Sequence, residues 1–234
     1  MAITYYHSEW GAQRPILGLL FDMDGLVLDS ETLYTRFWRE AAHFYGYPMT
    51  EEQSLGMRSL GRPQGQPYLE SLFGPGVDYT VLRSKRIELM DAYVDAHGIA
   101  PKPGIYELMD YLNENNIPAA ITSSSPMENI CRHLEKADLL HRFRKLCSGH
   151  EVPNGKPAPD IYLLGAKSLG LDPKNCLALE DSPTGIRAAH AAGCLSVMIP
   201  DLDQPGEETQ ALLFAKADSL ADIMELIKQQ NGHL

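Results

Sequence analysis

The sequence contains no apolar run that approaches the length of a membrane-spanning helix. Such a helix needs about 20 consecutive, mostly apolar residues, so the pattern excludes a membrane-embedded protein and argues against a membrane partner. Residues 1–15 also lack the continuous apolar stretch that a secretory signal requires. We therefore expect a soluble protein in the cytoplasm.

Basic residues are few, because 20 Lys and Arg stand against 31 Asp and Glu, which gives a formal net charge of −11. Nucleic acids and anionic membrane surfaces bind clusters of positive charge, so this balance disfavours both as partners. A small anionic substrate is compatible with it, because a bound metal ion or one or two well-placed cations can reverse the local field.

Cysteines are also few, and no two of them form a Cys-x-x-Cys pair. Their sequence neighbours are mostly apolar, which favours free, buried thiols over zinc ligands or disulfides. The four are Cys131, Cys147, Cys176 and Cys194. The sequence also lacks internal repeats and low-complexity segments, which argues against a repeat architecture.

A short apolar stretch, Ile16–Phe21, is followed at once by Asp22 and Asp24. Such a run is typical of a buried parallel strand, and in an extended chain residues i and i+2 point to the same side. The two carboxylates would leave the strand end together, where they repel each other unless a cation lies between them or one is protonated. The simplest occupant is Mg²⁺, which prefers oxygen ligands. The alternative is a polar turn that binds nothing.

The stretch 31–98 shows helical periodicity and no strand signal. Gly and Pro clusters separate its segments. The predicted helices are 31–45, 50–60, 67–73 and 81–97. A Gly-rich loop, 56–65, carries Arg58 and Arg62. The pattern predicts an all-helical insert.

Downstream of that insert, apolar strand patterns alternate with helical patterns. The predicted strands are 117–122, 145–147, 176–179 and 195–199, and the predicted helices are 105–115, 126–137, 159–169, 182–193 and 219–230. Ser125 and Glu128 have the spacing of a capping box at the start of the second of these helices. Alternation of this kind specifies an open, doubly wound parallel sheet. We therefore predict an α/β, Rossmann-like core domain over 1–30 and 99–234 and a helical cap domain over 31–98.

Polar residues follow four of the predicted strands, and ligands in such sheets bind outside the carboxyl ends of the strands. They are Asp22 and Asp24, Ser123 and Ser124, Lys156, and Glu180 and Asp181. Carboxylates at two strand ends can hold one Mg²⁺, whereas Ser123 and the amides at the next helix start can bind phosphate oxygens. Lys156 can neutralise a phosphoryl group and the carboxylate that attacks it. Taken singly, Lys156 would be interpreted as a surface lysine and the serines as helix-start residues.

Four segments resemble, in order, the four motifs of the haloacid dehalogenase superfamily. They are FDMDGLVLDSE at 21–31, ITSS at 121–124, GKPAPDIY at 155–162 and LEDSPTGIRAA at 179–189. The resemblance covers about residues 16–230 and is closest to the β-phosphoglucomutase-like branch, whose helical cap follows the first motif. It implies a phosphoric monoester hydrolase with Mg²⁺ as cofactor and a small phosphorylated metabolite as substrate. We expect a monomer or a weak homo-oligomer.

The resemblance also implies a role for each motif residue. Asp22 is the nucleophile that forms an aspartyl phosphate, and Asp24 is the general acid and then the base that activates water. Ser123 and Lys156 are catalytic residues that orient and neutralise the phosphate, with Ser124 as a substrate-binding candidate beside them. The implied magnesium ligands are Asp22, the backbone carbonyl of Asp24, Asp181 directly and Glu180 through a water. For Glu180 a purely structural role in its loop stays open.

In this branch the cap determines which substrate is bound, and the four motifs do not reveal its identity. Arg58 and Arg62 lie where this branch projects a substrate-specificity loop, so we predict that both bind substrate. Solvent-exposed arginines in a turn are the alternative.

Three functions are compatible with this sequence. The first is a Mg²⁺-dependent phosphatase for a small phosphomonoester such as a sugar phosphate or a nucleotide. The second is a phosphosugar mutase of the β-phosphoglucomutase kind. That branch's mutases carry a histidine where this chain has Tyr34, which favours hydrolysis. The third is a catalytically silent binding protein, against which the intact set of Asp22, Asp24, Lys156 and Asp181 argues.

Overall fold

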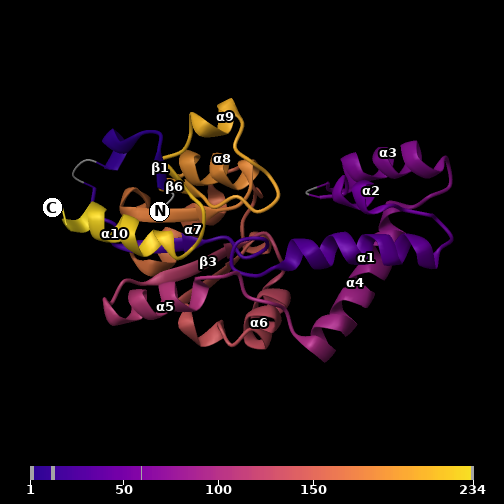
Figure 1. Ribbon diagram of the computed structural model, residues 1–234, viewed down its shortest axis with the longest axis horizontal. Coiled ribbons are helices and arrows are strands. Elements are labelled where there is room, and N and C mark those ends of the chain that lie inside the picture. Colours follow the sequence, from indigo (N-terminus) through magenta and orange to yellow (C-terminus); the bar gives the residue numbers. More distant parts are fainter. Residues whose placement is uncertain (1–2, 12–13, 59, 233–234) are drawn as a thin grey trace. The chain divides into compact units, whose positions relative to one another are not determined.

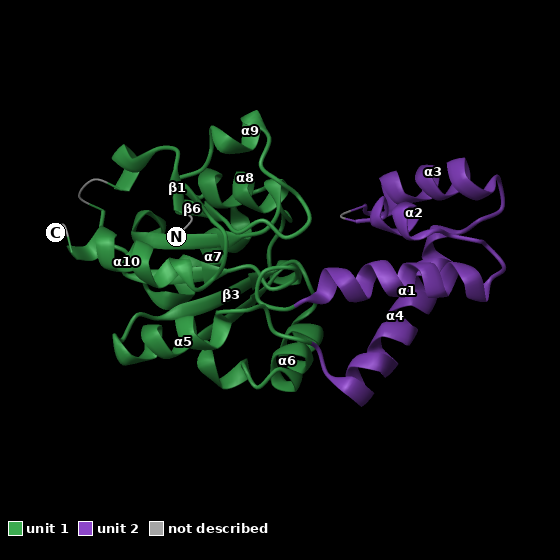
Figure 2. Cartoon of the chain, viewed as in Figure 1, with its two compact units in different colours: residues 1–28, 100–234 green, residues 29–99 purple. Residues whose placement is uncertain are grey.

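The computed structural model describes residues 3–11, 14–58 and 60–232. The chain forms two compact units: a core unit, 1–28 with 100–234, and a helical unit, 29–99 (Figure 2). None of the helices in the described ranges combines the length and the apolar character that crossing a membrane requires.

The core unit is built on a seven-stranded sheet in the order β1-β7-β6-β5-β2-β3-β4. Its strands are β1 (Ile3–Tyr5), β2 (Gly18–Phe21), β3 (Ala119–Ser123), β4 (Lys145–Ser148), β5 (Cys176–Glu180), β6 (Leu195–Met198) and β7 (Ala215–Ala217). Only the edge strand β1 pairs antiparallel, with β7, and the other pairings are parallel. The predicted doubly wound α/β fold is confirmed.

Helices cover both faces of this sheet, which explains why its central strands read as continuous apolar runs. The α-helices of the core unit are α5 (Ile105–Glu114), α6 (Met127–Lys136), α7 (Asp160–Leu169), α8 (Pro183–Ala191), α9 (Glu207–Gln210) and α10 (Asp222–Gly232). Short 3-10 helices cover Ser8–Gly11, Leu140–Arg142, Gly149–Glu151 and Pro173–Asn175. Residues of α7 and α8 pack with the strands in one buried cluster, and α5 and α6 lie on the other side of the strands from α8 (Figure 1).

The strand β2 lies between β3 and β5, and all four of its residues are buried. Its register pairs Phe21 with Ile121 on one side and with Leu179 on the other. The carboxyl ends of these three strands therefore lie next to each other. The segments that follow them supply most of the polar residues that the sequence singled out.

The helical unit consists of α1 (Ser30–Phe44), α2 (Glu51–Leu55), α3 (Arg62–Phe73) and α4 (Tyr79–His97). It has its own apolar core, and its described residues contain no strand. The buried members of that core are Trp38, Ala42, Met49, Met57, Leu69, Val77, Tyr79 and Leu82. An all-helical insert after the first buried strand is therefore present.

The prediction of a loop as far as residue 65 was wrong, because α3 begins at Arg62. Pro63 lies in the first helical turn, where the missing N–H costs nothing. Gly65 packs against the ring of Tyr79, where a Cβ atom would lie 2.5 Å from a ring carbon. Tertiary packing therefore selects a glycine that local propensity would read as a helix breaker.

The cysteines are free, as predicted. Cys147, Cys176 and Cys194 are buried, and Cys131 is half-buried. Burial raises the pKa of the Cys176 thiol to about 12, which keeps this thiol protonated and unreactive at neutral pH.

Candidate active site

The loop after β2 places two aspartates at the centre of the sheet's carboxyl edge. Asp22 continues the strand for one more residue, with its N–H donating to the carbonyl of Leu179 at 3.0 Å. Met23 is fully buried, as side-chain alternation between the two aspartates requires. Gly25 then turns the chain at φ 83°, in the left-handed region that glycine tolerates best.

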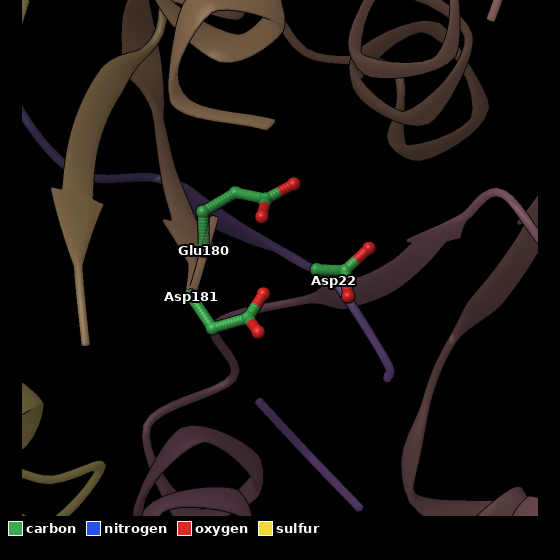
Figure 3. A group of neighbouring side chains, drawn as sticks. All are labelled: Asp22, Glu180 and Asp181. Atoms are coloured by element: carbon green, nitrogen blue, oxygen red, sulfur yellow. The ribbon is translucent and has the colours of Figure 1, made fainter. Parts of the chain in front are cut away.

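Three carboxylates from two neighbouring strands converge at this edge. Asp22, Glu180 and Asp181 each offer an oxygen, and these oxygens lie within 4.8 Å of one another (Figure 3). Asp22 and Glu180 are buried, with exposed fractions of 8% and 0%. Buried like charges at this distance are costly without a cation, and hard oxygen donors suit Mg²⁺. The residues present fit a magnesium ion.

Lys156, in the segment before α7, brings a positive charge into contact with this group. Its ammonium Nζ donates to Asp22 Oδ1 and to Glu180 Oε1, both at 2.5 Å. The Lys156 side chain is only 8% exposed. The interpretation of Lys156 as a surface lysine is therefore wrong.

The charges in this group shift each other's pKa. The pKa of Asp22 is raised to about 7 in total: burial raises it most, Lys156 lowers it, and the carboxylates of Glu180 and Asp24 raise it. Burial alone would lower the pKa of Lys156, but Asp22 and Glu180 hold it well above its ordinary value. Without a bound metal ion, the site therefore keeps its ammonium charged, and Asp22 takes up a proton as the pH falls below about 7.

Two serines, one at the end of β3 and one just after it, contact the second aspartate. Ser125 Oγ donates to Asp24 Oδ2 at 2.9 Å, whereas Ser123 Oγ is 3.5 Å from the same oxygen. Ser123 Oγ accepts the N–H of Ser125 at 3.0 Å. The predicted capping box is wrong: Pro126 is the N-cap of α6 and there is no side-chain cap bond. The hydroxyl of Ser125 contacts a site carboxylate, a role that the sequence reasoning missed.

Glu180 is held by residues that the sequence analysis did not assign. Its Oε1 also accepts the hydroxyl of Tyr162 at 2.5 Å, and its Oε2 accepts Ser182 Oγ at 3.2 Å. A Cβ atom on Gly185 would lie 1.9 Å from Glu180 Oε1. All three residues fall inside the quoted motifs, but only the folded structure shows that they converge on one carboxylate.

The remaining residues that were predicted to bind substrate are Ser124, Arg58 and Arg62. Ser124 is exposed beside the site. Arg58 is half-buried, with Nε donating to the carbonyl of Leu55 at 3.3 Å, and Arg62 is exposed at the start of α3. Both arginines belong to the helical unit, and their contact with substrate stays a prediction.

Comparison with known proteins agrees with this architecture. Residues 16–193 match the family model described as haloacid dehalogenase-like hydrolase. A "phosphorylated carbohydrates phosphatase" of Thermotoga maritima is 33% identical over 75% of this chain and 81% of its own. A Drosophila melanogaster protein named "probable pseudouridine-5'-phosphatase" is 35% identical over 89% of this chain and 92% of its own. The β-phosphoglucomutase of Clostridium difficile shares the fold, with a TM-score of 0.73 at 22% identity over 93% and 98% of the two chains.

A doubly wound sheet with an inserted helical unit, and with acidic residues and a buried lysine at its strand ends, defines a hydrolase of the haloacid dehalogenase type. The chain belongs to the haloacid dehalogenase-like hydrolase family. The resemblance inferred from the four motifs is thus confirmed.

Proposed function

We propose that the protein is a magnesium-dependent phosphatase that hydrolyses a small phosphomonoester, a sugar phosphate or a nucleotide, through an aspartyl phosphate on Asp22. Its class, phosphoric monoester hydrolase, follows from the family match and from the phosphatases among its relatives. The observation that carries the proposal is the buried ammonium of Lys156, 2.5 Å from both Asp22 and Glu180.

The two aspartates divide the proposed reaction between them. An Asp22 carboxylate oxygen attacks phosphorus, the bond from phosphorus to the substrate oxygen breaks, and Asp24 gives that oxygen a proton. A water oxygen then attacks phosphorus and its proton passes to Asp24. The bond from phosphorus to the Asp22 oxygen breaks, so inorganic phosphate leaves and the Asp22 carboxylate is restored. The Ser125 hydroxyl, 2.9 Å from Asp24 Oδ2, holds the carboxyl group that moves the proton.

Positive charge must offset the phosphoryl oxygens during both steps. Mg²⁺ would be held by Asp22, Asp181, the backbone carbonyl of Asp24 and, through a water, Glu180; when bound, it supplies charge next to the phosphoryl group. Lys156 supplies the second charge. An ammonium has three N–H donors, and Asp22 and Glu180 accept two of them. The third is directed to a substrate oxygen.

A screen of phosphate monoesters tests this function. Hexose, hexitol and pentose phosphates and nucleoside monophosphates are each incubated with the purified protein, with MgCl₂ or with EDTA, and released phosphate is measured. We expect hydrolysis of at least one class in MgCl₂ and none in EDTA. Equal turnover in EDTA would contradict the magnesium requirement, and no turnover of any ester would contradict the phosphatase.

The mutase alternative is not favoured by the two sequence relatives described above, both of which are named phosphatases. Tyr34, which stands where the mutases of that branch carry a histidine, has a phenol in place of an imidazole. Its ring packs against the guanidinium of Arg86, which lies 4.6 Å from the ring centroid. We expect steady phosphate release and negligible conversion of β-glucose 1-phosphate to glucose 6-phosphate. A coupled assay with glucose 1,6-bisphosphate present checks this, and isomerisation faster than phosphate release would reverse the assignment.

Metal binding and the protonation of Asp22 should compete. Because burial raises the pKa of Asp22 to about 7, the metal-free folded state binds this proton more tightly than the unfolded chain does. The protonated Asp22 contributes its full stabilisation when the pH is below the pKa of Asp22 in the unfolded chain. This contribution is lost as the pH rises towards 7. Mg²⁺ favours the ionised carboxylate instead. We therefore expect MgCl₂ to raise the Tm by at least about 2 °C more at pH 8 than at pH 5.5.

Thermal unfolding in EDTA and in MgCl₂ at the two pH values measures this difference. Asp22→Asn is the matched control, because it removes the titrating group while it keeps the shape of the side chain. In that variant the increase in Tm caused by MgCl₂ should depend much less on pH. If MgCl₂ raised the Tm of the unmodified protein equally at both pH values, the proton and the metal ion would not compete for Asp22.

A further inference from the structure

Tyr162, the third residue of α7, has a fully buried side chain that contacts two charged groups of the site. Its ring packs in the buried cluster between α7 and the sheet, and its hydroxyl donates to Glu180 Oε1 at 2.5 Å. The Lys156 ammonium lies 5.1 Å from the centroid of the same ring. The neutral side chain of Tyr162 therefore contacts both Glu180 and Lys156, which form the ion pair beside Asp22.

The hydroxyl of Tyr162 is one of three donors to the Glu180 carboxylate. Oε1 accepts Tyr162 and Lys156, and Oε2 accepts Ser182 Oγ at 3.2 Å. A fully buried carboxylate is costly unless its oxygens are bonded. With two donors on Oε1, Glu180 is held in one orientation and its pull on Lys156 is reduced. Without the hydroxyl, Lys156 would be the only donor to that oxygen among the residues that the structure describes.

The position of Lys156 is a balance between two carboxylates, since Nζ is 2.5 Å from Asp22 and 2.5 Å from Glu180. A stronger attraction to Glu180 moves the ammonium away from Asp22. The distance matters for phosphoryl transfer, because the charge of Lys156 must lie at the reacting group when the transition state forms. The orientation of Glu180 therefore controls a group that acts on the reaction.

We propose that Tyr162 is a positioning residue: its hydroxyl holds Glu180 so that the Lys156 ammonium lies against Asp22 and the transferring phosphoryl group. The inference rests on the proposed phosphatase function and adds a residue to it. Tyr162 touches neither the substrate nor the nucleophile in this scheme. It acts through Glu180 and Lys156.

Tyr162→Phe isolates the hydroxyl, because phenylalanine keeps the ring, its packing and its contact with the ammonium. We expect kcat to fall about tenfold, as loss of a hydrogen bond to a charged group predicts. The substrate KM should stay within about twofold, and the Tm should fall by no more than about 10 °C, because the lost hydrogen bond also stabilises the buried Glu180 carboxylate. Tyr106→Phe is the matched control, because Tyr106 donates to the Ala137 carbonyl at 2.5 Å in the same core unit, between α5 and the end of α6. Its kcat should not change.

Crystal structures of the unmodified protein and of Tyr162→Phe give a second readout that does not depend on turnover. We expect Lys156 Nζ to move towards Glu180 and away from Asp22, and to stay in place in Tyr106→Phe. An unmoved ammonium, an unchanged kcat, equal losses in both variants, or a Tm loss of more than about 10 °C in Tyr162→Phe would each overturn the proposal. If the ammonium moves but the unmodified protein hydrolyses no phosphomonoester, the proposed function fails and the positioning of Lys156 by Tyr162 stands.

Discussion

Asp22→Asn is expected to lower kcat by at least about a thousandfold while the protein stays folded. Asp22 is the only side chain assigned to form a covalent bond with the substrate, and an amide oxygen is a much weaker nucleophile than a carboxylate. The substitution keeps the shape of a side chain that is only 8% exposed. It also removes one of several crowded negative charges, so the Tm of the metal-free protein should not fall. Steady-state phosphate release and thermal unfolding measure the two effects.

Asp24→Asn provides the contrast, because Asp24 transfers protons and forms no covalent bond in the proposed reaction. With 4-nitrophenyl phosphate, whose leaving group needs no proton, the aspartyl phosphate should still form in this variant. Its hydrolysis should be slow, because no base activates the water. Intact-protein mass spectrometry after rapid quenching should detect one added phosphoryl group in Asp24→Asn and none in Asp22→Asn. Substantial magnesium-dependent turnover by Asp22→Asn would refute the assignment of the nucleophile.

Gly185→Ala is expected to lower kcat about a hundredfold, although alanine favours helices. In an unstrained helix this change would stabilise the protein by about 1 kcal/mol. Here the new Cβ atom would lie 1.9 Å from Glu180 Oε1 and 2.1 Å from Oε2. The carboxylate must turn away, and its bonds to Lys156 and Tyr162 are lost with it. Hydrogen bonds to charged groups contribute about 1.5–3 kcal/mol each, so their loss outweighs the gain in helix propensity.

Gly206→Ala is the matched control, because a Cβ atom there meets nothing within 4 Å and the glycine has an ordinary φ of −73°. This variant should keep the activity of the unmodified protein. The Tm of Gly185→Ala should fall, since overpacking of a buried site costs about 1–3 kcal/mol. Unchanged kcat and Tm in Gly185→Ala would mean that the orientation of Glu180 is unimportant for both catalysis and stability.

The positions of the site residues could be predicted because they depend on strand ends. A buried parallel strand is visible in the sequence as an apolar run, and the residue after it lies at the carboxyl edge of the sheet. From the predicted strand ends, Asp22, Lys156 and Glu180 were expected at the same edge of the sheet. The structure places them in direct contact, at 2.5 Å between the ammonium and each carboxylate oxygen.

The supporting residues could not be predicted, because their roles arise from contacts between distant segments. Ser125 has the local spacing of a helix cap, yet its hydroxyl donates to Asp24, 101 residues away in the sequence. Tyr162 has the hydrophobic periodicity of a core residue, and only its hydroxyl belongs to the site. Gly65 has the signature of a loop, but packing against Tyr79 places it within α3. In each case the local pattern gave a wrong or incomplete prediction, because a tertiary contact decided the outcome.

The central position of β2 determines how the site is lost when the protein unfolds. Its amides and carbonyls are paired with β3 on one side and β5 on the other, and Asp22 itself bonds to Leu179. Opening of this segment requires the middle of the sheet to separate, so the amide hydrogens of Leu20 and Phe21 should exchange with solvent only through global unfolding. The edge strand β1 has a single neighbour and should exchange faster. On heating, catalysis should therefore persist until the whole core unit melts.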